Sequence, residues 1–178
     1  MYLIHWLKIY VAIFQGSLNN NPSPGNKTGG ISTILEKSLG AVAKGGTSEL
    51  VDVIQYAEPI RTKGLVFMDS PGYDPVSVTG QVASGANVVC FTTGRGSVFG
   101  YKPVPSLKLA TNSSMFYRMT EDMDLNCGEI IDGTTDVQEM GSIIFQKILA
   151  TASRELTNSV EFEFGDYEFA HREIGAVL

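Results

Sequence analysis

Two short apolar runs, each closed by a polar turn, constrain the fold of this chain more than any other feature. The runs cover residues 64–69 (GLVFMD) and 87–92 (NVVCFT), and a helical pattern at 76–84 separates them. Short apolar runs bounded by turn residues are typical of strands buried on both faces. Strands that alternate with helices favour a parallel sheet with right-handed crossovers. The sequence therefore predicts an α/β fold with a mainly parallel sheet.

The remaining elements follow from the same patterns. A third strand is predicted at 106–110. Further helices are predicted at 2–14, from Ser32 or Thr33 to about Lys44, at about 49–56, from Ser113 or Ser114 to Met119, and from Thr135 or Asp136 to about Ser153. The tail at 162–178 mixes aromatic and acidic residues, so we expect it to dock on the body. Because the chain has no low-complexity linker, residues 1–178 are predicted to form a single α/β domain.

The N-terminal segment 1–14 is rich in apolar and aromatic residues, but His5 and Lys8 interrupt it. It is shorter than the about 20 residues that a membrane-spanning helix needs. It also lacks a basic region ahead of its apolar run and a clear cleavage site, which argues against a signal peptide. We expect instead a helix that packs against further chain upstream.

A loop at 16–30 precedes the helix that starts near Thr33, and its part at 21–30 reads NPSPGNKTGG. Prolines fix φ and glycines permit positive φ, so this loop can hold a sharply turned backbone with exposed N–H groups. Placed before a helix, it is a candidate anion cradle, because the N–H groups of the first helical turn lack internal partners and the helix dipole is positive there. The alternative is that it is only a turn.

Parallel sheets bind ligands beyond the carboxyl ends of their strands, and two such ends are visible. They read DSPGYD at 69–74 and TTGRG at 92–96. Arg95 in the second segment is a candidate clamp for a carboxylate, or a surface arginine that holds a loop. Asp74 in the first is a candidate acid or base, or the N-cap of the following helix.

The glycines at 94–100 (GRGSVFG) do not form a dinucleotide fingerprint. One residue too many precedes the last glycine, and Pro103 and Pro105 follow where a helix is required. A nucleotide-binding α/β module is therefore only a minor alternative.

The charge of the chain, with 13 basic and 19 acidic residues, gives a net −6. It provides no electrostatic reason to expect nucleic acid or an anionic membrane as a partner. Two cysteines do not make a disulfide framework, so reduced thiols and a cytoplasmic location are expected. Cys90 is interpreted as a buried small hydrophobe, and Cys127 as structural or as a metal or redox group.

An acidic segment at 121–132 carries five carboxylates. It is either a solvated turn or an oxygen-rich metal site, although the EF-hand spacing is absent. The five carboxylates belong to Glu121, Asp122, Asp124, Glu129 and Asp132.

Three long strings of this sequence resemble the altronate/galactarate dehydratase family of bacterial sugar-acid enzymes, and most closely its altronate branch. They are NPSPGNKTGGISTILEKSLGAVAKGG at 21–46, GLVFMDSPGYDPVSVTG at 64–80, and NVVCFTTGRGSVFG at 87–100. The match runs from about Tyr10 to Leu178. Because the family's enzymes are much longer, the resemblance implies the C-terminal part of a dehydratase and a Rossmann-like three-layer domain, incomplete in this chain.

The implied reaction converts D-altronate to 2-dehydro-3-deoxy-D-gluconate and water. Removing a proton beside a carboxylate and then a β-hydroxyl passes through a doubly negative intermediate, which needs positive charge, a base and an acid. The resemblance implies a divalent metal for this purpose, with Fe²⁺ as the first choice and Mn²⁺ as the alternative. The only histidines, His5 and His171, do not form a ligand pair, so any metal must be held by carboxylates, amides, hydroxyls, Cys127 or the absent part.

Eight residues are the resulting candidates. Lys27 is a base or an electrostatic anchor, and Asp74 is a metal ligand or an acid/base carboxylate. Glu36 is a metal ligand, or the partner of Thr33 in a capping box. Ser23 and Asn26 bind substrate hydroxyls or the metal, and the substrate carboxylate is held by Thr92, Thr93 and Arg95.

The expected partner is a small-molecule sugar acid, together with other copies of the chain or the missing upstream domains. An alternative of a different class is a truncated, non-catalytic product that binds a sugar acid or a full-length partner.

Overall fold

The structure is a computed structural model that describes residues 22–171. The helix predicted at 2–14 and the end of the tail at 172–178 lie outside the described residues. The chain divides into two compact units, one of residues 1–53, 61–67 and 172–178, and one of residues 54–60 and 68–171. Each unit is described by itself below. The single domain predicted for residues 1–178 stays a prediction.

In the first unit, a short helix α2 (Pro24–Thr28) occupies part of the loop predicted at 16–30. Ser23 caps it, since its Oγ accepts a hydrogen bond from the Asn26 N–H at 3.4 Å. Pro24 stands in the first turn, where its missing N–H has no intrahelical partner to lose. The expectation of an irregular loop at these five residues was therefore wrong.

The helix predicted to start near Thr33 is confirmed as α3 (Ile34–Lys44). Thr33 Oγ1 accepts from the Glu36 N–H at 3.2 Å, as in a capping box. The Glu36 carboxylate reaches one residue further back, where its Oε2 accepts from the Ser32 N–H at 2.9 Å and the Ser32 hydroxyl at 2.8 Å. These hydrogen bonds to Ser32 are the main reason why the pKa of Glu36 is lowered.

The helix predicted at 49–56 is wrong, because this stretch forms strand β1 (Leu50–Ile54). It pairs in a two-stranded sheet with β2 (Leu65–Met68), which confirms the strand predicted at 64–69. Valine and isoleucine favour strands, and pairing with β2 decides the conformation where the helical periodicity is weak. The expected burial of β2 was also wrong, since Phe67 is 59% exposed.

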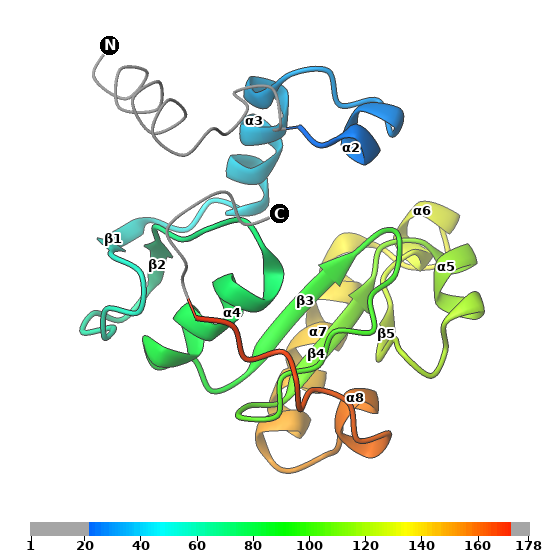
Figure 1. The fold of residues 1–178 in the computed structure, drawn as a ribbon. Helices are drawn as coiled ribbons and strands as arrows, with labels where there is room; N and C mark the ends of the chain where they lie inside the picture. The colour runs from blue at the N-terminus through cyan, green and yellow to red at the C-terminus, as the bar shows by residue number, and fades with distance from the viewer. Residues whose placement is uncertain (1–21, 172–178) are drawn as a thin grey trace. The chain divides into compact units, whose positions relative to one another are not determined.

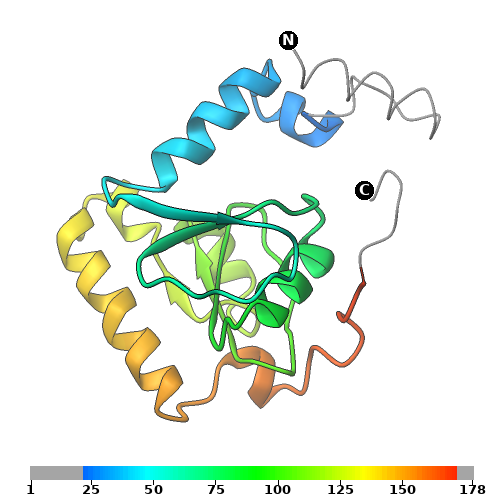
Figure 2. The same cartoon turned by 90° about the vertical axis from the view of Figure 1, so that its left-hand side faces the viewer.

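The second unit contains a three-stranded parallel sheet in the order β3–β4–β5. Its strands are β3 (Val89–Thr93), β4 (Ser106–Ala110) and β5 (Leu125–Asn126). The helices of this unit are α4 (Asp74–Ala83), α5 (Ser113–Arg118), α6 (Glu129–Asp132), α7 (Val137–Ala152) and α8 (Asn158–Glu161). The predicted α/β class is confirmed, and Figures 1 and 2 show α4 and α7 on opposite sides of this sheet.

The core of the second unit forms around β4, whose five residues are all buried. One apolar cluster joins α4 to β3 and the loop that follows it, and a second cluster lies at α5. The first consists of Val78, Val89, Phe99 and Tyr101, and the second of Ala110, Met115 and Met123. Cys90 on β3 is exposed, so its predicted burial was wrong, because only alternate residues of this strand face the interior.

The N-caps of α7, α5 and α4 differ in how well they match the predicted capping residues. Asp136 caps α7 as predicted, accepting from the Glu139 N–H at 2.8 Å. The cap of α5 is Asn112, one residue before the predicted serine. Asp74 is not an N-cap but the first residue of α4, which Tyr73 precedes without a side-chain cap.

The described part of the tail docks on the second unit as predicted. Lys102 Nζ lies 2.7 Å from Asp166, and the Ala170 N–H donates to Thr79 Oγ1 at 3.2 Å. The tail backbone also passes close to the Gly100 backbone: a Cβ on Gly165 would lie 2.7 Å from the carbonyl carbon of Gly100. Among the helices that the structure describes, none has the length and hydropathy that crossing a bilayer requires.

Replacing Gly165 by alanine should destabilise the fold by about 1–3 kcal/mol, because the new methyl group collides with the Gly100 backbone. Gly165 also has φ +104°, which alanine adopts only with strain. The matched control is Gly141→Ala, since Gly141 lies inside α7 with open space around it. That change should stabilise the protein by about 0.5–1 kcal/mol. Denaturant unfolding of both variants checks this, and equal effects would contradict the tail contact.

The capping carboxylate of Glu36 should make helix content depend on pH. Its folded pKa lies below 4.5, so its contribution is present above pH 4.5 and is lost as pH falls through the folded pKa. Glu36→Gln keeps an acceptor but removes the titration. Circular dichroism during acid titration should therefore show a helix loss in the wild type that the variant lacks, and superimposable curves would contradict this role.

Candidate functional site

The carboxyl edge is our name for the three segments that leave the parallel sheet: 93–96 after β3, 111–113 after β4, and 126–128 after β5. Because the strands are parallel, these segments emerge at the same end of the sheet. Figure 1 shows α5 and α6 at this end. Sheets of this kind bind ligands there, so the carboxyl edge is the candidate site.

The segments after β3 and β4 are tied together by hydrogen bonds. The Thr111 N–H and hydroxyl both donate to the Thr93 carbonyl, at 3.0 and 3.2 Å. Asn112 Nδ2 donates to the Gly94 carbonyl at 2.8 Å, while its Oδ1 accepts from the Met115 N–H at 2.9 Å. One asparagine thus caps α5 and holds the turn that carries Arg95.

A second network joins the segments after β4 and β5. The Ser113 hydroxyl donates to the Asp132 carboxylate and accepts from Asn126 Nδ2 at 2.9 Å. Asn126 Oδ1 accepts from the Gly128 N–H at 3.0 Å, and Asn126 is only 5% exposed. An amide, a hydroxyl and a carboxylate are therefore held in a fixed, connected arrangement at the edge.

Gly128 makes this arrangement possible. A Cβ at this position would lie 2.2 Å from the Ser113 backbone nitrogen and 2.5 Å from the Asn112 Cα. Real side chains do not tolerate such contacts, so only glycine lets the chain after β5 pass this close to the start of α5.

Three predicted residues belong to the carboxyl edge or to the strand that leads into it. Thr92 and Thr93 end β3, and Thr93 Oγ1 accepts from the Gly96 N–H at 3.1 Å. Arg95 follows in the same turn and is exposed. Within residues 22–171 its guanidinium makes no hydrogen bond or ion pair, so it is available to a ligand.

Asp74 lies in the same unit, at the start of α4. Partial burial raises the pKa of its carboxyl group, which favours the protonated form more than in water. This direction suits a group that takes up and releases a proton.

The other four predicted residues lie in the first unit, around α2 and α3. Ser23 caps α2, and Asn26 Oδ1 accepts from Lys37 Nζ at 3.1 Å. Glu36 binds Ser32 as described above, and Lys27 lies in the last turn of α2. The catalytic and binding roles assigned to all eight residues stay predictions.

A divalent metal does not fit the described residues by themselves. Residues 22–171 contain no group of three or more histidine, cysteine, aspartate or glutamate side chains that could hold one. Burial, and next the charge of Glu129, raises the pKa of the Cys127 thiol, which disfavours the thiolate that binds metals. Two carboxylates of the acidic segment bind the chain itself: Asp132 accepts from Ser113, and Asp124 from backbone N–H groups.

Sequence reasoning gave no site role to Asn112, Ser113 or Asn126, and it named Asp132 only as one of five carboxylates of a possible metal site. The first two follow the predicted strand at 106–110 directly, so the rule that singled out 92–96 would also have found them. Asn126 gave no such signal, because β5 has only two residues and no apolar run.

Comparison with known proteins shows which family the sequence of this chain matches. Residues 1–177 match the family described as D-galactarate/altronate dehydratase, C-terminal. A galactarate dehydratase (L-threo-forming) of Escherichia coli K12 is 39% identical over 150 residues, which cover 84% of this chain and 29% of that protein. The altronate dehydratase of Bacillus subtilis 168 is 36% identical over 162 residues, covering 91% of this chain and 32% of that protein.

The altronate dehydratase of Escherichia coli K12 is 39% identical over 131 residues, which cover 74% of this chain and 26% of that protein. The chain thus spans about a third of the length of the curated relatives that it matches. It belongs to the D-galactarate/altronate dehydratase family, whose C-terminal region it matches over nearly its whole length.

Proposed function

We propose that this chain contributes the substrate-carboxylate and hydroxyl subsites of a sugar-acid dehydratase, with D-altronate as substrate and 2-dehydro-3-deoxy-D-gluconate and water as products. The observation that carries the proposal is how the turn with Arg95 is tied to the carboxyl edge. Gly94 in that turn accepts a hydrogen bond from Asn112, and the next residue, Ser113, is bonded to Asn126 and Asp132. Within residues 22–171 the Arg95 guanidinium has no partner. The relatives named altronate and galactarate dehydratases support the choice of substrate class.

The proposed chemistry starts with a carboxylate held by charge-assisted hydrogen bonds. Arg95 offers a planar pair of N–H donors, and the hydroxyls of Thr92 and Thr93 lie on the strand that leads to it. Holding the carboxylate in this way stabilises the enediolate that forms when the neighbouring proton leaves. In the network of Ser113, Asn126 and Asp132, the exposed Asp132 carboxylate offers acceptors to the hydroxyls of the substrate, and the buried Asn126 holds Ser113 in place.

Proton transfer is proposed for Asp74 and Lys27, the first as acid or base and the second as base or electrostatic anchor. Ser23 and Asn26 are proposed for substrate hydroxyls or a metal, and Glu36 for a metal. The raised pKa of Asp74 supports its role. Glu36 has the weaker case, because its carboxylate already binds Ser32.

A divalent ion, Fe²⁺ or Mn²⁺, remains part of the proposal as a source of positive charge for the intermediate. Its ligands would have to include groups beyond the described residues. The cytoplasmic location and the association with further copies or upstream domains are likewise proposals.

A Rossmann-like three-layer domain is the fold we propose for the assembled region. The parallel order β3–β4–β5 supports it, as do the helices α4 and α7 on opposite sides of that sheet. The alternative function is a non-catalytic chain that binds a sugar acid or a full-length partner. This alternative is supported by the length of the chain, which covers only 26–32% of the dehydratase relatives from Escherichia coli and Bacillus subtilis.

Turnover separates the two functions. We expect the purified 178-residue chain, loaded with Fe²⁺ or Mn²⁺ under reducing conditions, to convert D-altronate to the 2-keto-3-deoxy product. Chromatographic detection of that product is the measurement, with galactarate and a metal-free sample as comparisons. A folded, metal-loaded sample that binds altronate without forming product would favour the non-catalytic alternative.

Arg95→Ala should weaken binding of altronate by about 1.5–3 kcal/mol, because a charge-assisted hydrogen bond to the carboxylate is lost. Calorimetry on the wild type and the variant measures this. Arg118→Ala, which removes an exposed arginine at the end of α5, is the matched control and should leave the affinity unchanged. Equal affinities of the wild type and Arg95→Ala would remove Arg95 from the site.

A further inference from the structure

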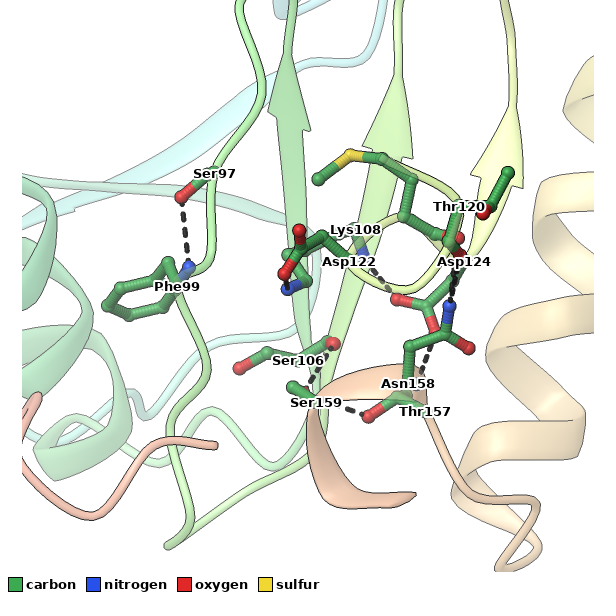
Figure 3. Close-up of polar contacts among 11 residues, drawn as sticks. Ser97, Phe99, Ser106, Lys108, Thr120, Asp122, Asp124, Thr157, Asn158 and Ser159 are labelled. Atoms are coloured by element: carbon green, nitrogen blue, oxygen red, sulfur yellow. Dashed lines mark hydrogen bonds and ion pairs between the residues drawn. The ribbon is translucent and has the colours of Figure 1, made fainter. Parts of the chain in front are cut away.

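Lys108 is a buried cation in the middle of the sheet. It stands on the central strand β4, its side chain is 0% exposed, and Nζ has no hydrogen-bond partner within the described residues. Its nearest opposite charge is Asp122, whose Oδ1 lies 4.0 Å away (Figure 3). Burying an ammonium group is costly unless carboxylates compensate it, so this lysine demands an explanation.

The segment 120–124 that faces Lys108 is held by hydrogen bonds from β4 on one side and from the start of α8 on the other. On one side, the Lys108 N–H donates to Asp124 Oδ2 at 2.7 Å, and the Asp124 N–H donates to the Lys108 carbonyl at 2.9 Å. On the other, the Asn158 N–H donates to Asp124 Oδ1 at 2.7 Å, and its Nδ2 donates to the carbonyls of Thr120 and Met123. Both oxygens of Asp124 are therefore occupied by backbone donors.

These hydrogen bonds of Asp124 with Lys108 and Asn158 fix the position at which β5 begins. The strand has only two residues, which pair Leu125 with Leu109 and Asn126 with Ala110. Such a short strand has few ladder hydrogen bonds of its own, so its register depends on what precedes it. Asp124 immediately precedes it and is fixed against Lys108. Two residues later, Asn126 reaches the carboxyl edge and bonds Ser113.

The positive charge of Lys108 offsets the repulsion between the carboxylates near it. Burial lowers the pKa of Lys108, and the negative charges of Asp122, Asp124 and Glu168 oppose this effect. Without the ammonium group, these carboxylates would repel one another in a partly buried place. The segment 120–124 would then move away from β4 and take β5 with it.

We propose that Lys108 and Asp124 are positioning residues for the carboxyl edge: together they fix the start of β5 and thereby hold Asn126 beside Ser113. The proposal rests on the proposed function only in taking the carboxyl edge as the substrate site. Neither residue needs to touch substrate.

The test uses NMR of the 178-residue chain without substrate to follow the position of β5 and Asn126. Lys108→Met keeps the length of the side chain and removes the charge. We expect the Asn126 side-chain amide signals to shift and the Cys127 amide, which donates to the Ala110 carbonyl, to exchange about tenfold faster or more. The control Lys102→Met removes an exposed ion pair with Asp166 and should change neither signal.

A charge-neutral double variant separates electrostatics from packing. If repulsion displaces the segment 120–124, Lys108→Met with Asp122→Asn should recover most of the Cys127 exchange protection. Wild-type behaviour in Lys108→Met, or no recovery in the double variant, would overturn the proposal. If Lys108→Met does not fold, the variant Asp124→Asn tests the proposal instead. It places an amide N–H donor against a backbone N–H donor, so the Cys127 amide should exchange faster. Unchanged Cys127 exchange would overturn the proposal.

Because no turnover is measured, the outcome is independent of the proposed function. A wild-type chain without dehydratase activity would count against the function and leave the positioning result intact.

Discussion

Parallel pairing around β4 is the constraint on which the second unit depends. This strand is buried along its whole length and carries a partner on each side, so both faces and both edges are occupied. Parallel pairing brings the ends of three strands to one edge, and only then can Thr93, Ser113 and Asn126 act together. The polar network at the edge is a consequence of the register, because a shift of one residue would turn Asn126 to the other face.

The sequence predicted the parts of the fold that local rules control. The third strand at 106–110, the helix after Thr33 and the cap at Asp136 all depend on short patterns and were found correctly. The error at 49–56 has a tertiary cause. A weak helical pattern gives way when β-branched residues find a strand to pair with, and a single sequence does not reveal that partner.

The candidate site was predictable to a lesser extent. Thr92, Thr93 and Arg95 follow an evident apolar run, whereas Asn126 follows a strand of two residues. Lys108 illustrates the limit most clearly, since a lysine within an alternating run suggests an exposed strand face, yet it is fully buried. The nearest compensating carboxylate, that of Asp122, comes from a loop. This loop is held by hydrogen bonds from Asn158 at the start of α8, which lies 34 residues after Asp124. Such long-range compensation leaves no local signal.

The exposure of Cys90 has a practical consequence. The chain has two cysteines, and of these only Cys90 is exposed, whereas Cys127 is half-buried. Cys90 stands on β3, three residues before the turn that carries Arg95 begins. A fluorophore attached to its thiol would therefore report on events at the end of this strand without any engineered residue. Since partial burial raises the pKa of this thiol, mildly alkaline conditions would speed the labelling reaction.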